Sequence, residues 1–205
     1  MKAVRFLRAG LGIALLCAST ACSHKASDSQ QGGDQSSAAI VTPTPGPILE
    51  RRVEIVTPEG NVVVSLDATH APNTVANFLG YVDRKFYDGG TFFRAVPGFV
   101  IQGGNQKRER PNDVKIDLES PAQTGLRNTD GAIAMARTMD PNSATSEFYI
   151  DIGDQASLDQ PPGYAAFGHV IKGMDVVHKI ASMPASQQML DRPVKIIKIY
   201  RVPNS

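Results

Sequence analysis

The sequence has no tryptophan, only two cysteines and few aromatic residues, which make up 6% of its 205 residues. The two cysteines, Cys17 and Cys22, lie five positions apart near the N-terminus. They cannot supply a disulfide framework for the rest of the chain. The core of the folded part must therefore be held together by packing alone.

The chain also has no excess of charge of one sign and no long hydrophobic run. It has 21 basic and 20 acidic residues, so its bulk charge gives no reason to expect nucleic acid as a partner. No apolar stretch approaches the roughly 20 residues of a membrane-spanning helix. With 41% hydrophobic residues, the composition predicts one folded domain with some additional chain.

Signatures of metal, cofactor and covalent chemistry are missing as well. The histidines His24, His70, His169 and His178 each stand alone, without a second ligand at metal-binding spacing. The sequence has no nucleophile elbow, Walker loop or dinucleotide-binding glycine pattern. If the domain is an enzyme, we expect a reaction that needs no metal, no cofactor and no covalent intermediate.

The N-terminal residues 1–22 have the pattern of a bacterial export signal. Lys2, Arg5 and Arg8 precede an apolar stretch over residues 9–18, and small residues follow. The ending Ser-Thr-Ala-Cys resembles the lipobox of bacterial lipoproteins, in which the cysteine is lipidated. We expect a signal peptide over 1–21, cleavage before Cys22 and a lipid on that cysteine. Cleavage by an ordinary signal peptidase, which also prefers small residues, remains the alternative.

The expected location follows from the same segment. Without residues 1–21 the chain has a formal charge of −2, so acidic lipid headgroups would not attract it. A lipid on Cys22 would anchor it instead, since each buried methylene contributes about 0.8 kcal/mol. Ser23 stands where an aspartate would have suggested inner-membrane retention. We therefore predict attachment to the outer membrane of a bacterial cell envelope, facing the periplasm, with a soluble periplasmic protein as the alternative.

Residues 22–50 are rich in Ser, Gln, Gly and Pro and show no hydrophobic periodicity. Such a segment cannot bury enough apolar area to offset the entropy of ordering, so we predict a disordered tether. As a flexible chain it would span about 30 Å. The alternative is a proline-rich recognition segment.

Residues 51–205 are long enough for one core and contain alternating and helical patterns. A Pro58-Glu59-Gly60 turn joins two expected strands into a hairpin. Helices are expected over 71–82, with Val75, Phe78, Leu79 and Val82 inward, and over 174–181. The expected strands are 52–57, 61–66, 91–96, 99–102, 131–136, 148–152, 165–170 and 194–200. Short strands at this spacing favour a closed or sandwiched antiparallel sheet.

Four motifs carry most of the information about function: FFRAVPGFVIQGGN at 92–105, GLRNTDGAIAMART at 125–138, SATSEFYI at 143–150 and FGHVIKGMDVV at 167–177. They resemble motifs of the cyclophilins, the prolyl isomerase family, and occur in the same order as in bacterial members. The resemblance covers essentially all of residues 51–205 and none of the first 50.

This resemblance implies a mainly β fold, an eight-stranded antiparallel closed barrel capped by two α-helices. It also implies peptidyl-prolyl cis-trans isomerase activity without a cofactor, on proline-containing polypeptides. Together with the export signal, this leads us to expect folding envelope proteins as partners, and we expect a monomer. Carried over residue by residue, the substrate groove would contain Arg94, Phe99, Val100, Gln102, Ala136, Arg137, Glu147, Tyr149, Leu158 and Tyr164.

The chemistry of this set suits rotation about a prolyl bond. Twisting the amide forfeits its resonance, which sets a barrier of about 18 to 20 kcal/mol. In the twisted amide the prolyl nitrogen can accept a hydrogen bond, and Arg94 is an always-protonated donor. Phe99, Val100, Tyr149 and Leu158 would seat the proline ring. Gln102 and the main chain of residues 136–137 would hold the substrate backbone.

One residue departs from the family pattern, because Glu147 stands where cyclophilins usually carry glutamine. Its carboxylate could pair with Arg94 and compete with a substrate, or favour substrates with a basic residue near proline. Alternatively, it turns to solvent. A binding module or holdase that uses the same groove with little turnover is the rival function.

Overall fold

The computed structural model describes residues 50–108 and 113–203. The predicted signal peptide, Cys22 and residues 22–49 of the predicted tether lie outside the described residues. The strands are β1 (Glu50–Thr57), β2 (Gly60–Asp67), β3 (Thr91–Val96), β4 (Val100–Gly104), β5 (Ala132–Met135), β6 (Phe148–Asp151), β7 (Ala166–Lys172), β8 (Ala185–Ser186), β9 (Met189–Lys195) and β10 (Lys198–Val202). The helices are α1 (Pro72–Asp83), α2 (Pro121–Thr124) and α3 (Met174–Ala181), and a 3-10 turn, η1, spans Ala156–Asp159.

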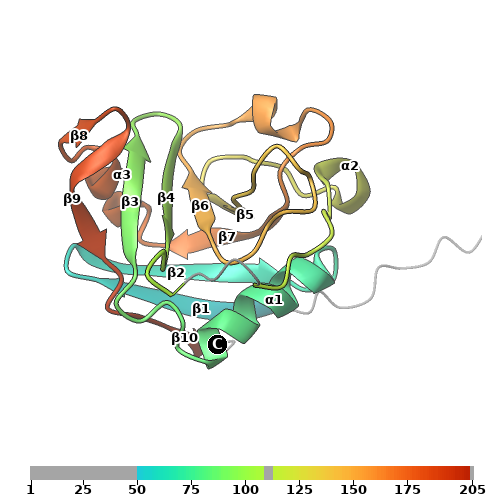
Figure 1. Cartoon of the computed structure of the whole chain (residues 1–205), viewed down its shortest axis with the longest axis horizontal. Coiled ribbons are helices and arrows are strands. Elements are labelled where there is room, and N and C mark those ends of the chain that lie inside the picture. Colours follow the sequence, from blue (N-terminus) through green and yellow to red (C-terminus); the bar gives the residue numbers. More distant parts are fainter. Residues whose placement is uncertain (1–49, 109–112, 204–205) are drawn as a thin grey trace, which may run out of the picture. The chain divides into compact units, whose positions relative to one another are not determined.

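The described strands form a single antiparallel sheet in the order β10-β1-β2-β7-β5-β6-β4-β3-β9-β8 (Figure 1). The prediction of a mainly β fold is confirmed. The prediction of a closed eight-stranded barrel is wrong, because the described sheet has ten strands and is not closed. Its outermost strands, β10 and β8, each pair on one side only within the described residues.

The single strand expected over 194–200 is also wrong, because two strands, β9 and β10, fall in this range; the short strand β8 was not predicted. Ile196 donates its backbone N–H to the Gly90 carbonyl, whereas Ile197 donates to the Val56 carbonyl. The chain thus leaves β9, which pairs with β3, and enters β10, which pairs with β1. A mostly apolar run such as residues 194–200 cannot show where a strand exchanges one partner for another.

The predicted hairpin is confirmed by the pairing of β1 with β2. Val53 lies opposite Val64 and Ile55 lies opposite Val62, and all four side chains are buried. Residues two apart in a strand share a face, so this alternation directs one face of the hairpin into the core.

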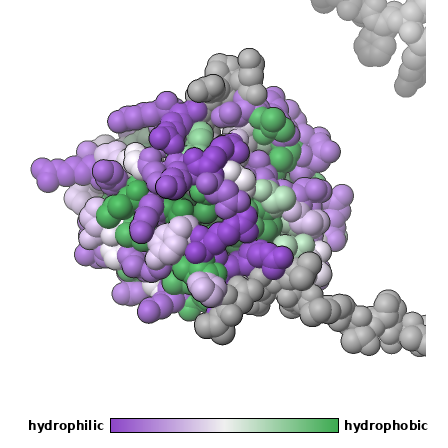
Figure 2. Space-filling model, turned by 90° about the horizontal axis from the view of Figure 1, so that it is seen from below, coloured by the Kyte–Doolittle hydropathy of each residue, from purple (hydrophilic) through white to green (hydrophobic). Residues whose placement is uncertain are grey.

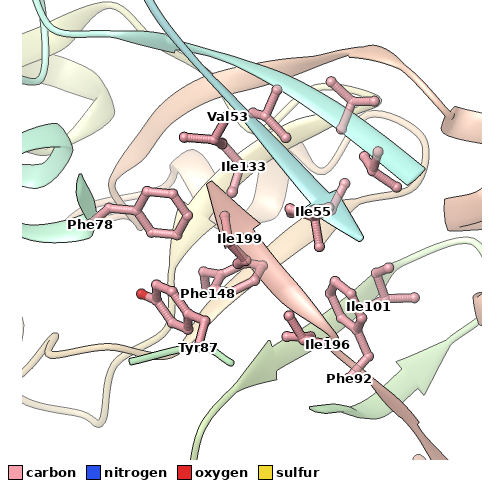
Figure 3. Close-up of a cluster of buried hydrophobic side chains, with 14 of the residues drawn as sticks. Val53, Ile55, Phe78, Tyr87, Phe92, Ile101, Ile133, Phe148, Ile196 and Ile199 are labelled. Carbon is pink, nitrogen blue, oxygen red and sulfur yellow. The ribbon is translucent and has the colours of Figure 1, made fainter. Parts of the chain in front are cut away.

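Both predicted helices are present and bury the faces expected of them. On α1 the residues Val75, Phe78, Leu79 and Val82 are buried. The ring of Phe78 lies with its centroid 5.3 Å from that of Tyr87 and 5.5 Å from that of Phe148 (Figure 3). The helix packs against β2 and β10, and α3 packs against β2, β3 and β4. Aromatic rings at these separations contribute beyond their buried area.

The N-terminus of α1 is capped by a residue that is distant in sequence. Ala71 occupies the N-cap position and has no side-chain acceptor to offer. The carboxylate of Glu119 accepts hydrogen bonds from the backbone N–H groups of Asn73 and Thr74, at 3.0 and 2.8 Å, and from the Thr74 hydroxyl at 2.6 Å. A negative charge at this end satisfies unpaired donors and complements the helix dipole.

The surface seen from below shows apolar patches separated by hydrophilic side chains (Figure 2). Large hydrophobic residues that are exposed in the described part include Met139, Ile171 and Met189. In the described residues, no helix is long and apolar enough to span a bilayer.

Candidate active site

The candidate site lies on the face of the sheet opposite the main core, where the strand register aligns a row of side chains. Arg94 on β3 pairs with Gln102 on β4, which pairs with Tyr149 on β6. Tyr149 in turn pairs with Ala134 on β5, and Ala134 with Ala166 on β7. Five neighbouring strands therefore contribute one residue each to a single cross-strand row.

A β-bulge directs Arg94 to this face. In β3, Phe92 belongs to the main core, and strict alternation would place Arg94 on the same side. Phe92 pairs with Gly103 and Arg94 with Gln102, so Phe93 is an extra residue in the ladder. A bulge of this kind reverses the facing of the residues that follow it. Ala95 consequently returns to the core, and Arg94 reaches the pocket.

The row borders a pocket of about 230 Å³. It is lined by Arg94, Phe99, Val100, Gln102, Ala136, Arg137, Tyr149, Leu158 and Tyr164. All of these are residues that the sequence analysis placed in the groove. Glu147, the remaining residue of that set, does not line the pocket, although it contacts Gln102.

The floor of the pocket is apolar and separate from the main core. Val100, Ala134, Tyr149 and Ala166 form a small buried cluster of their own. The partly buried side chains that pack on it include Phe99, Leu158 and Tyr164. The two alanines were not among the predicted site residues. They lie at the end of the row, on β5 and β7, and the alternating alanines at 132, 134 and 136 were the signal in the sequence for the first of them.

Tyr149 is fixed beneath the pocket by a hydrogen-bond chain. Its hydroxyl donates to the Asn128 side-chain oxygen at 2.8 Å. The amide nitrogen and backbone N–H of Asn128 donate to Asp159 at 2.8 and 2.9 Å. Burial raises the pKa of Tyr149 well above its ordinary value, so the phenol remains a protonated donor. Sequence reasoning missed both partners, although Asn128 lies within one of the four motifs.

Arg137 and Tyr164 form another part of the pocket lining. The Arg137 guanidinium carbon lies 4.2 Å from the Tyr164 ring centroid, and its nitrogens donate to the Gly163 carbonyl at 3.2 and 2.9 Å. The Tyr164 ring meets Tyr149 edge-on at 6.0 Å. The Ala136 N–H donates to the Glu147 carbonyl at 2.9 Å. That N–H is therefore engaged, and the Ala136 carbonyl is the group left to pair with a substrate backbone.

The Arg94 guanidinium is held along one edge and available along the other. Its Nε and Nη2 donate to the side-chain oxygen of Gln188 at 3.0 and 2.6 Å, and its Nη1 donates to that of Gln102 at 3.4 Å. The guanidinium carbon lies 5.9 Å from the Phe99 ring centroid. Arginine carries five N–H donors, so one on each terminal nitrogen remains for a substrate. Nothing in the sequence had indicated Gln188.

Glu147 neither pairs directly with Arg94 nor turns fully to solvent. Gln102 lies between Glu147 and Arg94. Its side-chain oxygen accepts a hydrogen bond from Arg94, and its side-chain N–H donates one to the Glu147 carboxylate at 2.8 Å. Gln106 donates to the other carboxylate oxygen at 3.2 Å, and Glu147 is half-buried. A Cβ at Gly104 would lie 3.1 Å from the Glu147 Cγ, so this glycine makes room for the carboxylate. The direct ion pair with Arg94 is not formed.

Asp151 is an unexpected buried acid on the same strand face as Tyr149. It is fully buried, and neither carboxylate oxygen has a hydrogen-bond partner among the described residues. Burial, reinforced by the nearby charges of Asp159 and Asp130, raises the pKa of Asp151 to about 8. The carboxyl group is therefore mostly protonated at neutral pH.

Comparison with known proteins agrees with the motifs and the fold. Residues 52–203 match the family model described as cyclophilin type peptidyl-prolyl cis-trans isomerase/CLD. A peptidyl-prolyl cis-trans isomerase of Acinetobacter baylyi is 43% identical over 156 residues, covering 72% of this chain and 83% of the relative. Peptidyl-prolyl cis-trans isomerase B of Escherichia coli is 37% identical over 145 residues, covering 67% and 88%.

Among solved structures, a cyclophilin type peptidyl-prolyl cis-trans isomerase of Cryptosporidium parvum superposes with a TM-score of 0.68. It is 24% identical, and the match covers 76% of this chain and 99% of that one, which supports the fold. The chain belongs to the cyclophilin-type peptidyl-prolyl cis-trans isomerase family.

The buried acid predicts a pH-dependent stability. An unfolded chain releases the Asp151 proton near pH 3.9, whereas the folded chain releases it near pH 8. Between these values the folded state binds one more proton, so raising the pH favours unfolding by up to about 1.4 kcal/mol per pH unit. We expect Asp151→Asn to make the free energy of unfolding, measured by urea unfolding, fall less steeply with pH between about pH 5 and 8.

The exposed Asp175 on α3 provides a control for this experiment. For Asp175→Asn, the plot of unfolding free energy against pH should run parallel to that of the parent protein over the same range. If Asp151→Asn also runs parallel to the parent, the carboxyl group of Asp151 does not titrate between these pH values, and our account of it is wrong.

Proposed function

We propose that this isomerase accelerates rotation about X-Pro bonds by binding the twisted amide in the 230 Å³ pocket more tightly than either planar form. The uncatalysed barrier of about 18 to 20 kcal/mol comes from amide resonance, and no bond has to be made or broken. Catalysis then requires only differential binding of the transition state. The observation that carries the proposal is that one small pocket combines a partly satisfied guanidinium with an apolar floor.

Each wall of the pocket has a part in this mechanism. The floor around Val100 and Tyr149 seats the proline ring, so that rotation takes place on its acyl side. The two remaining N–H groups of Arg94 donate to the prolyl nitrogen as its lone pair becomes free. The Ala136 carbonyl and the Gln102 side chain hold the substrate backbone beside the rotating bond.

Replacement of Arg94 tests the mechanism directly. Removing an oriented donor of this kind costs about two to three powers of ten in rate. We expect Arg94→Ala to lower kcat/KM by this factor in a protease-coupled isomerisation assay, mainly through kcat. Arg201→Ala, which removes an arginine paired with Asp83 outside the pocket, should leave the activity unchanged.

Two results would contradict the mechanism. A folded Arg94→Ala variant with parental kcat/KM would exclude Arg94 as the donor. A parent protein that binds proline peptides without accelerating their exchange would indicate the binding module considered as the rival function.

We further propose that Glu147 selects substrates with a basic residue near proline. Gln102 shields Arg94 from the carboxylate, so Glu147 does not compete for the guanidinium that acts on the substrate. Its half-buried carboxylate, which accepts hydrogen bonds from Gln102 and Gln106, places a negative charge beside the pocket. Since partly exposed ion pairs contribute about 0.2 to 1 kcal/mol, the preference should be severalfold at most.

Substrate series differing in one residue test this preference. We expect Glu147→Gln to reduce the ratio of kcat/KM for a lysine-containing peptide to that for its alanine counterpart by about two- to fivefold. The lysine should be placed at each of the two positions before proline, and the ratio measured at low ionic strength. An unchanged ratio at both positions would remove Glu147 as a determinant of specificity.

We also propose that the protein acts as a monomer on proline-containing polypeptides in the bacterial cell envelope, tethered to the outer membrane by a lipid on Cys22. The export-signal pattern of residues 1–21 and the lipobox-like ending before Cys22 support this proposal. The predicted bound at residue 50 is one residue too far, because Glu50 belongs to β1; a tether that ends at residue 49 would let the catalytic domain reach chains folding near the membrane.

Lipidation can be tested with the two cysteines of the chain. We expect the full-length protein, expressed in a Gram-negative bacterium, to incorporate labelled palmitate and to fractionate with the outer membrane. Cys22→Ala should abolish the label, whereas Cys17→Ala, the matched control, should retain it. An unlabelled parent protein in the soluble periplasmic fraction would favour the alternative of ordinary signal cleavage.

A further inference from the structure

Gln188 binds the edge of the Arg94 guanidinium that faces away from the proposed substrate contact. Its single side-chain oxygen accepts hydrogen bonds from both Nε and Nη2, at 3.0 and 2.6 Å. Gln188 is not among the residues that line the pocket. It therefore touches the arginine without lining the space that a proline would fill.

The backbone around Gln188 holds this side chain in place. Ser186 pairs with Met189, so Gln187 and Gln188 are the two central residues of the turn between β8 and β9. The Gln188 carbonyl accepts a hydrogen bond from the Ala95 N–H at 2.9 Å. Main chain and side chain of Gln188 thus bind two consecutive residues of β3, Ala95 and Arg94. These bonds hold the guanidinium at a fixed position relative to the sheet.

The turn itself has an unusual sequence. Gln187 and Gln188 have φ angles of 51° and 70°, in the left-handed region that two-residue hairpin turns require. Glycine and asparagine are the residues that usually occupy such positions. A glutamine at position 188 is not explained by the backbone, but it is explained by its hydrogen bonds to Arg94. A residue held in a disfavoured conformation is a reason to ask what its side chain does.

We propose that Gln188 is a positioning residue for catalysis, which fixes Arg94 so that its two remaining N–H groups point at the rotating amide. The inference rests on the role proposed for Arg94. An amide oxygen suits this task because it accepts two N–H groups without neutralising the positive charge. Arginine side chains have many rotamers, and a guanidinium already ordered in the free enzyme does not have to be ordered in the transition state.

The two glutamines of the turn provide a matched pair of variants. Gln187 and Gln188 are both exposed and both left-handed, but the Gln187 side chain makes no hydrogen bond within the described residues. Glycine is favoured at both positions, so neither Gln188→Gly nor Gln187→Gly should impair folding. We expect Gln188→Gly to lower kcat/KM by roughly three- to tenfold, mainly through kcat, because the hydrogen bonds it removes are charge-assisted but exposed. Gln187→Gly should match the parent protein.

A double-mutant comparison shows whether the effect passes through Arg94. In an Arg94→Ala background, Gln188→Gly should cause no further loss of activity. The Nε–H resonance of Arg94 in a nitrogen-15 NMR spectrum provides a readout that does not depend on turnover. It should be protected from exchange in the parent protein and in Gln187→Gly, and it should be lost in Gln188→Gly.

Several outcomes would overturn the proposal. These are parental kcat/KM in a folded Gln188→Gly variant, an equal loss in Gln187→Gly, an undiminished loss in the Arg94→Ala background, or an Nε–H resonance that Gln188→Gly leaves unchanged. If the Nε–H resonance behaves as expected but the parent protein shows no isomerase activity, the proposed function fails while the contact that holds Arg94 is established.

Discussion

The site depends above all on the antiparallel register that places Arg94, Gln102, Tyr149, Ala134 and Ala166 in one row across five strands. The ladder fixes the backbone of each of these residues, and the Arg94 guanidinium is then held above it by the side chains of Gln188 and Gln102. A reaction that needs only a shaped and oriented surface can be catalysed by such a rigid row.

The same sheet serves two demands that conflict at one position. Its inner face must be apolar to pack with α1 and α3, whereas its outer face must present a charged donor. The bulge at Phe93 reconciles the two, because it lets Phe92 and Ala95 remain in the core while Arg94 faces outward. Polar residues then link the row to its surroundings, with Gln188 on one side and Asn128 on the other.

Local patterns predicted much of the fold. The alternation in residues 52–66 and the helical spacing of Val75, Phe78 and Leu79 indicated the hairpin and α1, because these elements are specified by neighbours in the chain. Most of the lining of the pocket followed from the four motifs, whereas Leu158 and Tyr164 lie outside them and followed from the wider family resemblance. The closed barrel and the continuous strand over 194–200 were wrong, since strand partnership depends on residues far away, such as Val56 and Gly90.

The sequence by itself determined the composition of the core, the succession of elements and the family whose motifs line the pocket, since each is recorded in residue type and spacing. Only the tertiary structure decided that Gln188 holds Arg94, that Gln102 separates Arg94 from Glu147, and that Asp151 is buried without a partner. These facts depend on distances between residues remote in the chain. No periodicity encodes them, because they arise only when the sheet brings its strands together.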